Sequence, residues 1–327
     1  MRSSIVTIGE TMALLGTPDH CLLRPGSAPS LRIGGAESNV AIAAARLGAR
    51  TTWIGRIGDD DLGSLVEREL RGQAVNVLAS RDPQAPTGLM VKEHRRGKPT
   101  HVRYYRKHSA GSCLRPEDLD EDSLVQADVV HLTGITAALG ESARAALHHA
   151  IAAARRGRAR VSFDVNYRAT MWPPDTATLV LRELASATDI LFAGPEEAAL
   201  LLPGCPDPAA DDDPWRAATQ LAHRVRELGP STVVIKLGSL GALALDDETL
   251  YIHPIVPIEP VDPVGAGDAF VGAFLAELVD NSPIETCLTS GAKMGALVCA
   301  APGDWEGALD WSTDADADAD AVADVRR

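Results

Sequence analysis

The sequence contains no apolar run long enough to cross a membrane, since a spanning helix needs about 20 such residues. Its first apolar stretch, residues 5–8, is also too short for the hydrophobic segment of a secretion signal and is typical of a β-strand. We therefore expect a soluble, cytoplasmic protein that makes no contact with a membrane.

Closely spaced cysteines are lacking as well. The chain has five cysteines, an odd number, which lie far apart and never in C-x-x-C spacing: Cys21, Cys113, Cys205, Cys287 and Cys299. This pattern argues against a disulfide framework and predicts buried free thiols in a reducing compartment.

Positive charge is scarce. The chain has 31 Lys and Arg against 45 Asp and Glu, a net charge of −14, and no basic run longer than Arg95-Arg96 or Arg155-Arg156. A nucleic-acid surface needs a patch of Lys and Arg that neutralises phosphates. We therefore expect no nucleic-acid partner.

Short β-branched runs alternate with Ala- and Leu-rich segments whose apolar residues recur at helical spacing. Strands are predicted at residues 5–8, 51–54, 128–132, 160–163, 189–192 and 232–236, and helices at residues 39–47, 62–70, 142–154 and 215–228. Such alternation is typical of a parallel sheet with helices on both faces. The fold class is therefore α/β.

Two segments interrupt this alternation. Residues 12–35 are rich in Gly, Pro and Ser, and residues 87–107 contain two extended arms around a turn at residues 96–98. We expect them to form a small antiparallel lid, whose free edge favours a homo-oligomer. Residues 313–327 alternate Asp with Ala and have no apolar face, which predicts a disordered acidic tail after a folded domain at residues 1–312.

The segment Asp262-Pro-Val-Gly-Ala-Gly-Asp268 carries the clearest chemical signal. Apolar residues recur at helical spacing after Asp268, so Gly265, Ala266 and Gly267 are predicted to lie at a helix N-terminus. Such a terminus binds anions through its unpaired amides and its dipole, and a nearby carboxylate can orient the proton of an attacking hydroxyl. This combination suits phosphoryl transfer to an alcohol, although a capped helix without chemistry also accounts for the segment alone.

A second Gly-rich turn follows the strand predicted at residues 232–236. Lys236, Gly238 and Gly241 form a cradle suited to the phosphates or ribose of a nucleotide. The chain has no G-x-x-x-x-G-K-[ST] motif, and Phe270 stands where G-x-G-x-x-G needs its third glycine. P-loop NTPases and dinucleotide oxidoreductases are therefore both disfavoured.

A third glycine turn, Gly34-Gly35, opens the first predicted helix, with Asn39 in its first turns. An amide side chain both donates and accepts hydrogen bonds, which suits the hydroxyls of a sugar. A helix cap is the alternative for this segment.

Taken in their order along the chain, these motifs resemble those of the ribokinase-like, pfkB-type family of carbohydrate kinases. The matching segments are Gly34-Gly-Ala-Glu-Ser-Asn-Val-Ala41, Gly55-Arg-Ile-Gly58-x-Asp60-x-x-Gly63, Lys236-Leu-Gly-Ser-Leu-Gly241 and Asp262-Pro-Val-Gly-Ala-Gly-Asp-Ala-Phe270. The resemblance implies a Rossmann-type αβα sandwich with a small β-sheet lid, and ATP as donor with Mg²⁺. A monovalent cation is a further candidate cofactor.

The resemblance also implies roles for single residues. Asp268 would be the catalytic base, and the amides of Gly265, Ala266 and Gly267 would form the anion hole. One motif departs from the family, which has N-x-x-E where this chain reads Gly194-Pro-Glu-Glu197. Glu197 stays the candidate for the Mg²⁺–phosphate network, whose Asn is missing.

Within the family the chain is most similar to kinases of 2-keto-3-deoxygluconate. The supporting segments are Gly9-Glu10, Tyr104-Tyr-Arg-Lys-His-Ser-Ala110, Asp164-Val-Asn-Tyr-Arg168 and Gly303-Asp-Trp-Glu-Gly307. This similarity implies substrate contacts from Tyr104, Arg106 and Arg168, with Asp304 nearby. Arginine independently suits a sugar acid, because its guanidinium pairs with a carboxylate through two hydrogen bonds.

Alternatives remain at this level. Arg106 also fits a solvated lid residue, Arg168 an ion pair at a strand end, and Asp304 a surface turn. The acceptor could be 2-keto-3-deoxygalactonate, fructose, ribose or a nucleoside, because a single hydroxyl is distinguished by pocket geometry. A sugar-binding protein without catalysis is the alternative outside the enzymes.

The acidic tail gives a first testable prediction. Because its Asp–Ala alternation provides no side chains to bury, deleting residues 314–327 should leave kinase activity and the thermal midpoint almost unchanged. Thermal melts and initial rates of the full and shortened chains test this expectation. A clear loss of stability in the shortened chain would show that the tail docks on the domain.

Overall fold

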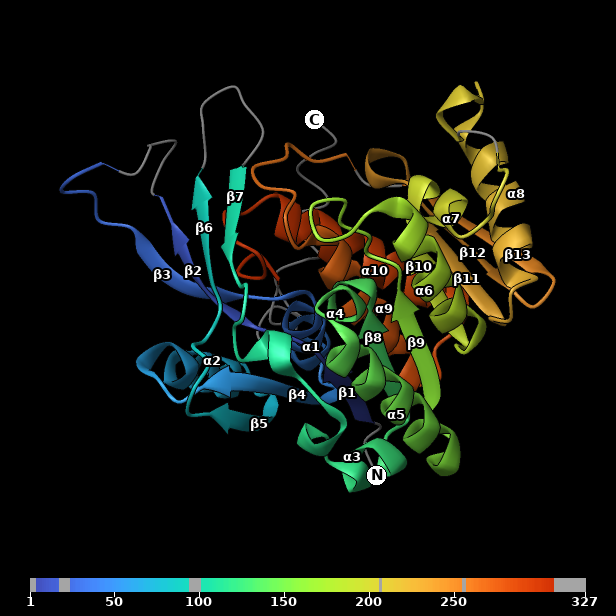
Figure 1. Ribbon diagram of the computed structural model, residues 1–327. Coiled ribbons are helices and arrows are strands. Elements are labelled where there is room, and N and C mark those ends of the chain that lie inside the picture. Colours follow the sequence, from blue (N-terminus) through green and yellow to red (C-terminus); the bar gives the residue numbers. More distant parts are fainter. Residues whose placement is uncertain (1–3, 18–23, 94–100, 206–207, 255–256, 309–327) are drawn as a thin grey trace.

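The computed structural model describes residues 4–17, 24–93, 101–205, 208–254 and 257–308. Cys21, the turn expected at residues 96–98 and the acidic tail at residues 313–327 lie outside the described residues, so the predictions for them stay predictions. The described part of the chain forms a large sheet flanked by helices and a small sheet beside it (Figure 1).

The large sheet has nine strands in the described ranges, in the order β13-β12-β11-β10-β9-β8-β1-β4-β5. Their bounds are β1 Ser4–Ile8, β4 Arg50–Gly58, β5 Asn76–Asp82, β8 Val129–Thr133, β9 Arg160–Asp164, β10 Ile190–Ala193, β11 Thr232–Lys236, β12 Gly241–Asp246 and β13 Thr249–Pro254. Strands β5 to β11 in this order are all parallel, as predicted, whereas β12 and β13 continue the sheet antiparallel. Sequence analysis did not predict this antiparallel edge.

Helices and short 3₁₀ turns connect the strands in the described ranges. The helices are α1 Ala36–Arg46, α2 Asp61–Gly72, α3 Glu121–Gln126, α4 Gly134–Ala138, α5 Glu141–Gly157, α6 Pro174–Ser186, α7 Pro195–Leu200, α8 Pro214–Arg226, α9 Ala266–Val279 and α10 Ile284–Cys299, and the 3₁₀ turns are Gly111–Cys113, Pro116–Asp118, Pro208–Ala210 and Gly238–Leu240. All four predicted helices are present and start one to three residues earlier than expected.

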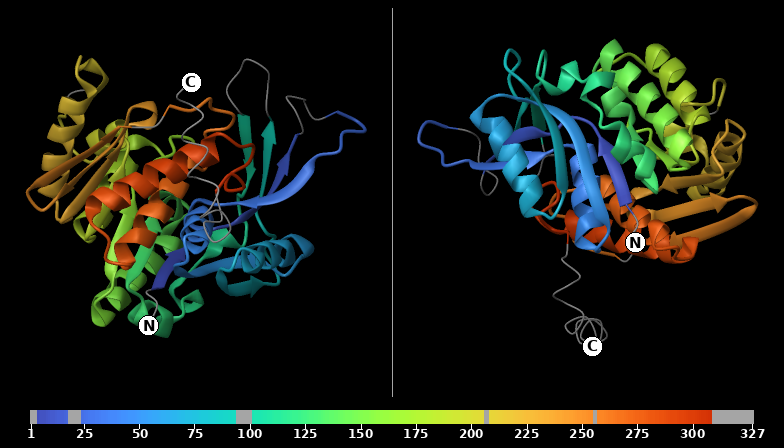
Figure 2. Two further views of the ribbon diagram at one scale, coloured as in Figure 1. Left: turned by 180° about the vertical axis from the view of Figure 1, so that it is seen from behind. Right: turned by 90° about the horizontal axis from the view of Figure 1, so that it is seen from below.

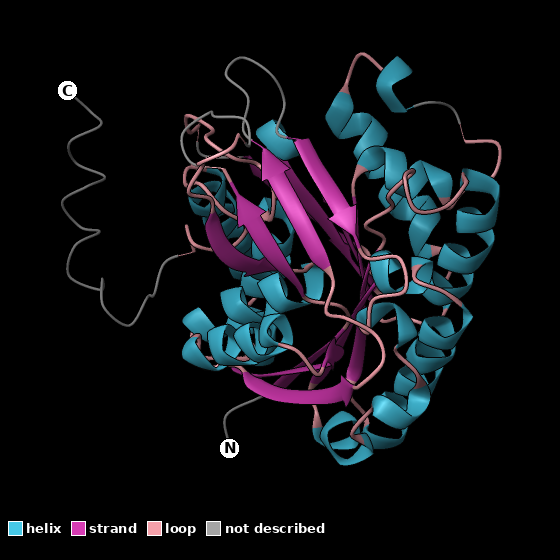
Figure 3. Ribbon diagram, turned by 60° about the vertical axis from the view of Figure 1, so that its left-hand side comes forward, coloured by secondary structure: helices cyan, strands magenta, loops and turns pink. Residues whose placement is uncertain are grey.

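Helices cover both faces of the large sheet because its strands are apolar on both sides. Leu191 belongs to the core under α3 to α8, whereas its neighbour Phe192 belongs to the core under α1, α9 and α10. Alternate residues of a strand point to opposite faces, so a strand buried on both sides is apolar throughout. Figure 2 shows α9 and α10 on the face opposite to α5 and α6, and Figure 3 shows strands between two groups of helices.

The small sheet is the predicted lid. It has the order β3-β2-β6-β7, with β2 Met12–Gly16, β3 Ser30–Gly34, β6 Leu89–Glu93 and β7 His101–Tyr105. Its two antiparallel pairs, β2 with β3 and β6 with β7, agree with the expected extended arms, but β2 and β6 join them in parallel. The homo-oligomer suggested by a free lid edge stays a prediction.

Asp60, from the motif at residues 55–63, connects the lid to the large sheet. The Asp60 carboxylate caps α2 by accepting from Gly63 N at 2.7 Å, and it also accepts from Thr87 N at 2.8 Å and Thr87 Oγ1 at 2.7 Å. Thr87 lies two residues before β6. The segment Gly55–Gly63, one of the motifs that resemble the kinase family, therefore holds the residues through which the chain enters β6 of the lid.

The cysteines are free, as predicted, in the described part of the chain, but they are not all buried. Cys287 is buried, Cys205 and Cys299 are half-buried, and Cys113 is exposed. Cys113 lies in a 3₁₀ turn after the lid rather than in the core. Among the described residues, none of the helices has both the length and the apolar composition that a bilayer-spanning segment needs.

Candidate active site

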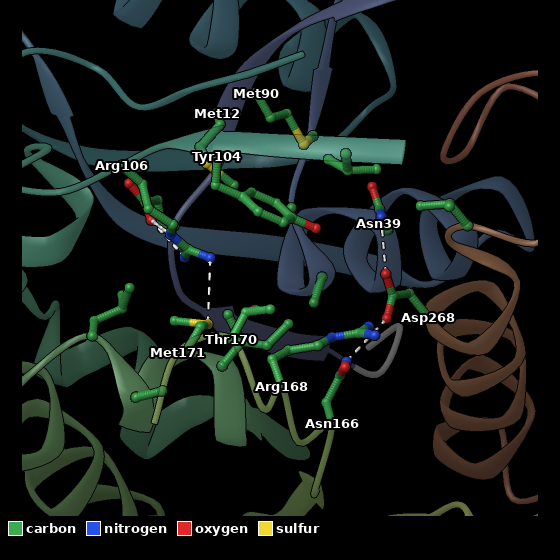
Figure 4. A pocket seen from close by; sticks show the side chains of 18 of the residues that line it. Met12, Asn39, Met90, Tyr104, Arg106, Asn166, Arg168, Thr170, Met171 and Asp268 are labelled. Atoms are coloured by element: carbon green, nitrogen blue, oxygen red, sulfur yellow. Dashed lines mark hydrogen bonds and ion pairs between the residues drawn. The ribbon is translucent and has the colours of Figure 1, made fainter. Parts of the chain in front are cut away.

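A cavity of about 1240 Å³ lies between the lid and the ends of the large sheet. Lid residues such as Met12, Met90 and Tyr104 line one side, and residues that follow β9 or begin α9 line the other (Figure 4). Parallel α/β sheets bind ligands at the carboxyl ends of their strands, where loops converge. The position of the cavity agrees with this rule.

The start of α9 forms part of the cavity wall. Gly265 caps the helix in the left-handed conformation, with φ of 84°, and Ala266 begins it. A Cβ on Gly265 would lie 1.8 Å from the Asp304 carbonyl oxygen, so only glycine fits here. The first amides of a helix have no acceptor within it and carry the positive end of its dipole. The structure therefore places a helix N-terminus suited to an anion where the sequence predicted one.

Asp268 lies in the first turn of α9 and is half-buried in the cavity. Its Oδ2 accepts a hydrogen bond from Asn39 Nδ2 at 2.9 Å, and its Oδ1 accepts one from Asn166 Nδ2 at 3.4 Å. Burial raises the pKa of the Asp268 carboxyl to about 7; the Asn39 hydrogen bond opposes this rise, and the nearby Asp164 carboxylate adds to it. At neutral pH this carboxyl can therefore both accept and release a proton.

Asn166 is a site residue that sequence analysis did not single out. It follows β9 by two residues, has a positive φ of 38°, and directs its amide at Asp268. The signal was available, since Asn tolerates this backbone conformation and an amide side chain suits sugar hydroxyls, which is the property that selected Asn39.

The two predicted arginines differ in how they are held. Arg106 pairs with the buried Glu10, whose Oε2 accepts from Arg106 Nε at 2.8 Å and lies 2.6 Å from Arg106 Nη2. Its guanidinium also lies 5.8 Å from the centre of the Tyr104 ring. Arg168 is exposed on the opposite side of the cavity and extends toward Asp268 (Figure 4).

Glu10 is the partner that sequence analysis missed. Besides Arg106 it contacts Ser109, whose hydroxyl donates to Glu10 Oε1, and its side chain packs against Gly88 and Gly111. These residues lie where the chain enters and leaves the lid. Glu10 therefore balances the charge of Arg106. It also joins the two places where the chain enters and leaves the lid to the end of β1.

The glycine pair of the first motif permits close packing around the same cavity. A Cβ on Gly34 would lie 2.7 Å from Asp304 Oδ2, and one on Gly35 would lie 2.4 Å from the Glu10 carbonyl oxygen. Asp304 itself is buried, lines the cavity and pairs with Lys92 at 2.6 Å. It is therefore part of an ion pair beside the site and does not lie in a surface turn.

A second cavity, of about 590 Å³, lies on the other side of the α9 N-terminus. Its lining is mostly apolar, with Pro257, Ile258 and Phe270, and it includes the turn that contains Gly238 and Gly241. Lys236, Pro263 and Gly267 line both cavities. Two ligands in the two cavities would therefore meet at the start of α9.

Lys236 and two carboxylates lie where the cavities meet. Lys236 Nζ pairs with Asp164 Oδ2 at 2.6 Å, while the buried Asp164 Oδ1 has no hydrogen-bond partner among the described residues. Glu197 Oε1 accepts from Tyr167 N at 2.9 Å and Oε2 accepts from Gly194 N at 2.7 Å. Burial raises the pKa of Glu197, against the effect of Lys236.

No group of three or more His, Cys, Asp or Glu side chains in the described ranges is arranged to hold a metal ion. Mg²⁺ is normally held by one or two carboxylates together with water and the phosphates of a nucleotide. Asp164 and Glu197, beside Lys236, fit such a shared site. Gly194 N donates to Glu197 Oε2, so the turn holds this carboxylate, but Gly194 provides no side chain for the Mg²⁺–phosphate network.

Comparison with known proteins extends these observations. The family model described as "pfkB family carbohydrate kinase" matches residues 2–310. The chain is 35% identical to a 2-dehydro-3-deoxygalactonokinase of Haloferax volcanii, over 93% of both proteins. It is 36% identical to a 2-dehydro-3-deoxygluconokinase of Thermoproteus tenax, over 93% of this chain and 90% of that protein. A crystal structure of 2-dehydro-3-deoxygluconokinase from Thermotoga maritima superposes with a TM-score of 0.85 at 28% identity, over 93% of this chain and 95% of that one.

The raised pKa of Asp268 gives a stability prediction. Its pKa is about 7 in the folded protein against an ordinary 3.8, so ionising it destabilises the fold increasingly as pH rises from about 4 to about 7. Asp268→Asn removes this cost. Because Asp268 is partly exposed and solvent screens its charge, the variant should raise the free energy of unfolding at pH 8 by about 1–3 kcal/mol.

Denaturant unfolding of both proteins at pH 5 and pH 8 measures this effect. The variant should gain more at pH 8 than at pH 5. An equal difference at both pH values would mean that the Asp268 carboxyl titrates near its ordinary pKa.

Proposed function

Because the chain belongs to the pfkB family of carbohydrate kinases, we propose that it transfers the γ-phosphoryl group of ATP to a small sugar acid. The family and the fold predicted from the sequence motifs are confirmed. The principal acceptor is 2-keto-3-deoxygluconate (2-dehydro-3-deoxygluconate), and the product is 2-keto-3-deoxy-6-phosphogluconate. Relatives named for this sugar acid and for its galactonate epimer make the epimer the second candidate.

The position of Arg168 is the main observation that supports a sugar acid as the acceptor. Its guanidinium reaches into the larger cavity, and no hydrogen bond or ion pair engages it among the described residues (Figure 4). A guanidinium binds a carboxylate through a planar pair of charge-assisted hydrogen bonds. A neutral sugar gives no reason to leave such a group open beside Asp268. Tyr104 and Arg106 line the opposite side of the acceptor site, with the charge of Arg106 already balanced by Glu10.

Asp268 acts as the general base. Its carboxylate accepts the proton of the acceptor hydroxyl as that oxygen attacks the γ-phosphorus of ATP. Asn39 and Asn166 hold one carboxylate oxygen each, which fixes the orientation of the base. Asn39 also has a buried Oδ1 without a partner among the described residues, which can accept from a second acceptor hydroxyl.

The N-terminus of α9 stabilises the transferring group. The amides of Gly265, Ala266 and Gly267, together with the helix dipole, face the negative charge that develops on the phosphoryl oxygens. Lys236 adds a positive charge between the two cavities. The adenine and ribose lie in the apolar second cavity against the turn of Gly238 and Gly241. Mg²⁺, when bound through Asp164 and Glu197, neutralises charge on the phosphates.

A coupled ADP-release assay with a panel of acceptors tests the function. The panel contains both 2-keto-3-deoxy sugar acids, fructose, ribose and adenosine, and the sugar acids should give the highest kcat/KM. Asp268→Asn should lower kcat about 10²- to 10⁴-fold, because the base is lost while the amides of α9 remain. In the wild type, kcat/KM should fall as pH drops below about 7, where the Asp268 carboxyl becomes protonated.

Three results would contradict the proposal. A preference for a neutral sugar would remove the sugar-acid assignment and leave only the kinase. Activity of Asp268→Asn close to that of the wild type would remove the proposed base. Binding of sugar acids without any ADP release would favour a binding protein that has lost catalysis.

The role of Arg168 is tested by comparing charged and neutral acceptors. Hydrogen bonds to charged groups contribute about 1.5–3 kcal/mol, so Arg168→Ala should lower kcat/KM for 2-keto-3-deoxygluconate about 10- to 100-fold. The loss should nearly vanish for fructose used as a poor acceptor, and Arg168→Lys should recover only part of it. Arg106→Ala is the matched variant, and its loss should be less selective because it also leaves the buried Glu10 unpaired. Equal losses on both acceptors for Arg168→Ala would show that this arginine does not bind the carboxylate.

A further inference from the structure

Lys92 lies on the lid strand β6 and is almost completely buried, with 1% of its surface exposed. Its Nζ lies 2.5 Å from Asp262 Oδ2, 2.6 Å from Asp304 Oδ1 and 3.3 Å from the Gly303 carbonyl oxygen. Lysine is rarely buried to this extent, and a buried charge must be compensated by partners of good geometry. The ammonium is therefore surrounded by oxygen atoms in the way a bound cation would be.

The two carboxylates belong to the loops that shape the α9 N-terminus. Asp262 begins the loop that leads to Gly265; its Oδ1 accepts from Val264 N at 3.2 Å and its Oδ2 accepts from Gly303 N at 3.4 Å. The Asp304 carbonyl oxygen lies directly against Gly265, where a Cβ would be only 1.8 Å away. Lys92 thus holds together both loops on which the position of the anion-binding amides depends.

A monovalent cation, named above as a candidate cofactor, would compete with Lys92 for the side-chain oxygens of this loop. A cation that orders the loop would need buried oxygen ligands beside it. Asp262 is fully buried and is the carboxylate of this loop, and its oxygens already accept from Lys92 and from backbone amides. A second positive charge here would meet the Lys92 ammonium at close range.

We propose that Lys92 is a positioning residue whose ammonium serves as a built-in cation for the loop from Asp262 to Gly265, so that phosphoryl transfer by this chain needs no monovalent cation. The inference rests on the proposed kinase function and adds to it how the anion hole is ordered. It also makes transfer depend on the position of the lid, because Lys92 reaches the loop from a lid strand.

The response to monovalent cations tests this proposal. Wild-type kcat should change less than about twofold between K⁺, Na⁺ and tetramethylammonium buffers of equal ionic strength. Lys92→Ala should lose on the order of 10- to 100-fold in kcat with little change in the KM of the sugar acid, since loss of loop position affects transfer. K⁺, ammonium or methylammonium should restore part of this loss, and Lys92→Arg should retain most activity because it keeps the charge.

Arg32→Ala is the matched control. Arg32 also joins the lid to the loop of Asp304, through the Pro302 carbonyl at 3.1 Å and Glu306 at 3.3 Å, but it is partly exposed, and these two contacts do not involve Asp262. An exposed pair of this kind contributes little, so this variant should keep wild-type kcat and show no response to cations.

A second readout separates failure of this inference from failure of the proposed function. The thermal midpoint and the affinity for a non-hydrolysable ATP analogue, measured without acceptor, should depend on K⁺ in Lys92→Ala and not in the wild type. These measurements need no acceptor, so they still test the role of Lys92 if no sugar acid is phosphorylated. Lack of phosphorylation would count only against the proposed function.

Three outcomes would overturn the role of Lys92. Strong activation of the wild type by K⁺ would show that a soluble cation is needed. Full activity of Lys92→Ala in every buffer would show that the ammonium positions nothing. Inactivity of Lys92→Arg together with Lys92→Ala would mean that packing, and not charge, makes this residue necessary.

Discussion

The N-terminus of α9 must remain open to an anion while it is packed against a neighbouring loop, and the rest of the site depends on this constraint. Gly265 meets it, because its left-handed conformation turns the chain into the helix and its missing Cβ leaves room for the Asp304 backbone. The helix then extends between α1 and α10 on one face of the sheet, and its first residues line two cavities. Burial of the apolar body of α9 supplies the rigidity that its polar end requires.

Charge is arranged around this helix end in pairs. Lys236 with Asp164, Arg106 with Glu10 and Lys92 with Asp304 each place a cation and a carboxylate within 2.6 Å. Each pair joins segments far apart in the sequence and compensates a charge that burial alone would penalise. Arg168 differs, since it is exposed and its guanidinium makes no hydrogen bond or ion pair within the described ranges, although its charge partly offsets the burial that raises the pKa values of Asp268 and Glu197. This guanidinium would therefore be available to a charged acceptor group.

The lid takes part in the site as well as covering it. Tyr104 and Met90 line the acceptor cavity, while Lys92 reaches beneath it to the loops before α9. Glu10 joins the places where the chain enters and leaves the lid. Because one small sheet lines the proposed acceptor cavity and also contacts the loops before α9, the positions of the lid and of the proposed anion hole are physically connected. Under the proposed function, this connection would favour transfer when the lid encloses an acceptor and excludes water.

The sequence alone determined the features that depend on near neighbours. Glycines at positions 265 and 267, followed by apolar residues at helical spacing, define the start of α9 locally, and the alternation of strands and helices defines the sheet. Tertiary structure decided which charges meet, because these contacts join residues distant in the sequence: Arg106 and Glu10 are 96 positions apart, and Lys92 and Asp304 are 212 apart. Two further features were visible only in the tertiary structure: the hydrogen bond from Asn166 to Asp268, and the antiparallel strands at one edge of the parallel sheet. Local propensity carries no information on such pairings, since they form only when the whole sheet has brought its strand ends together.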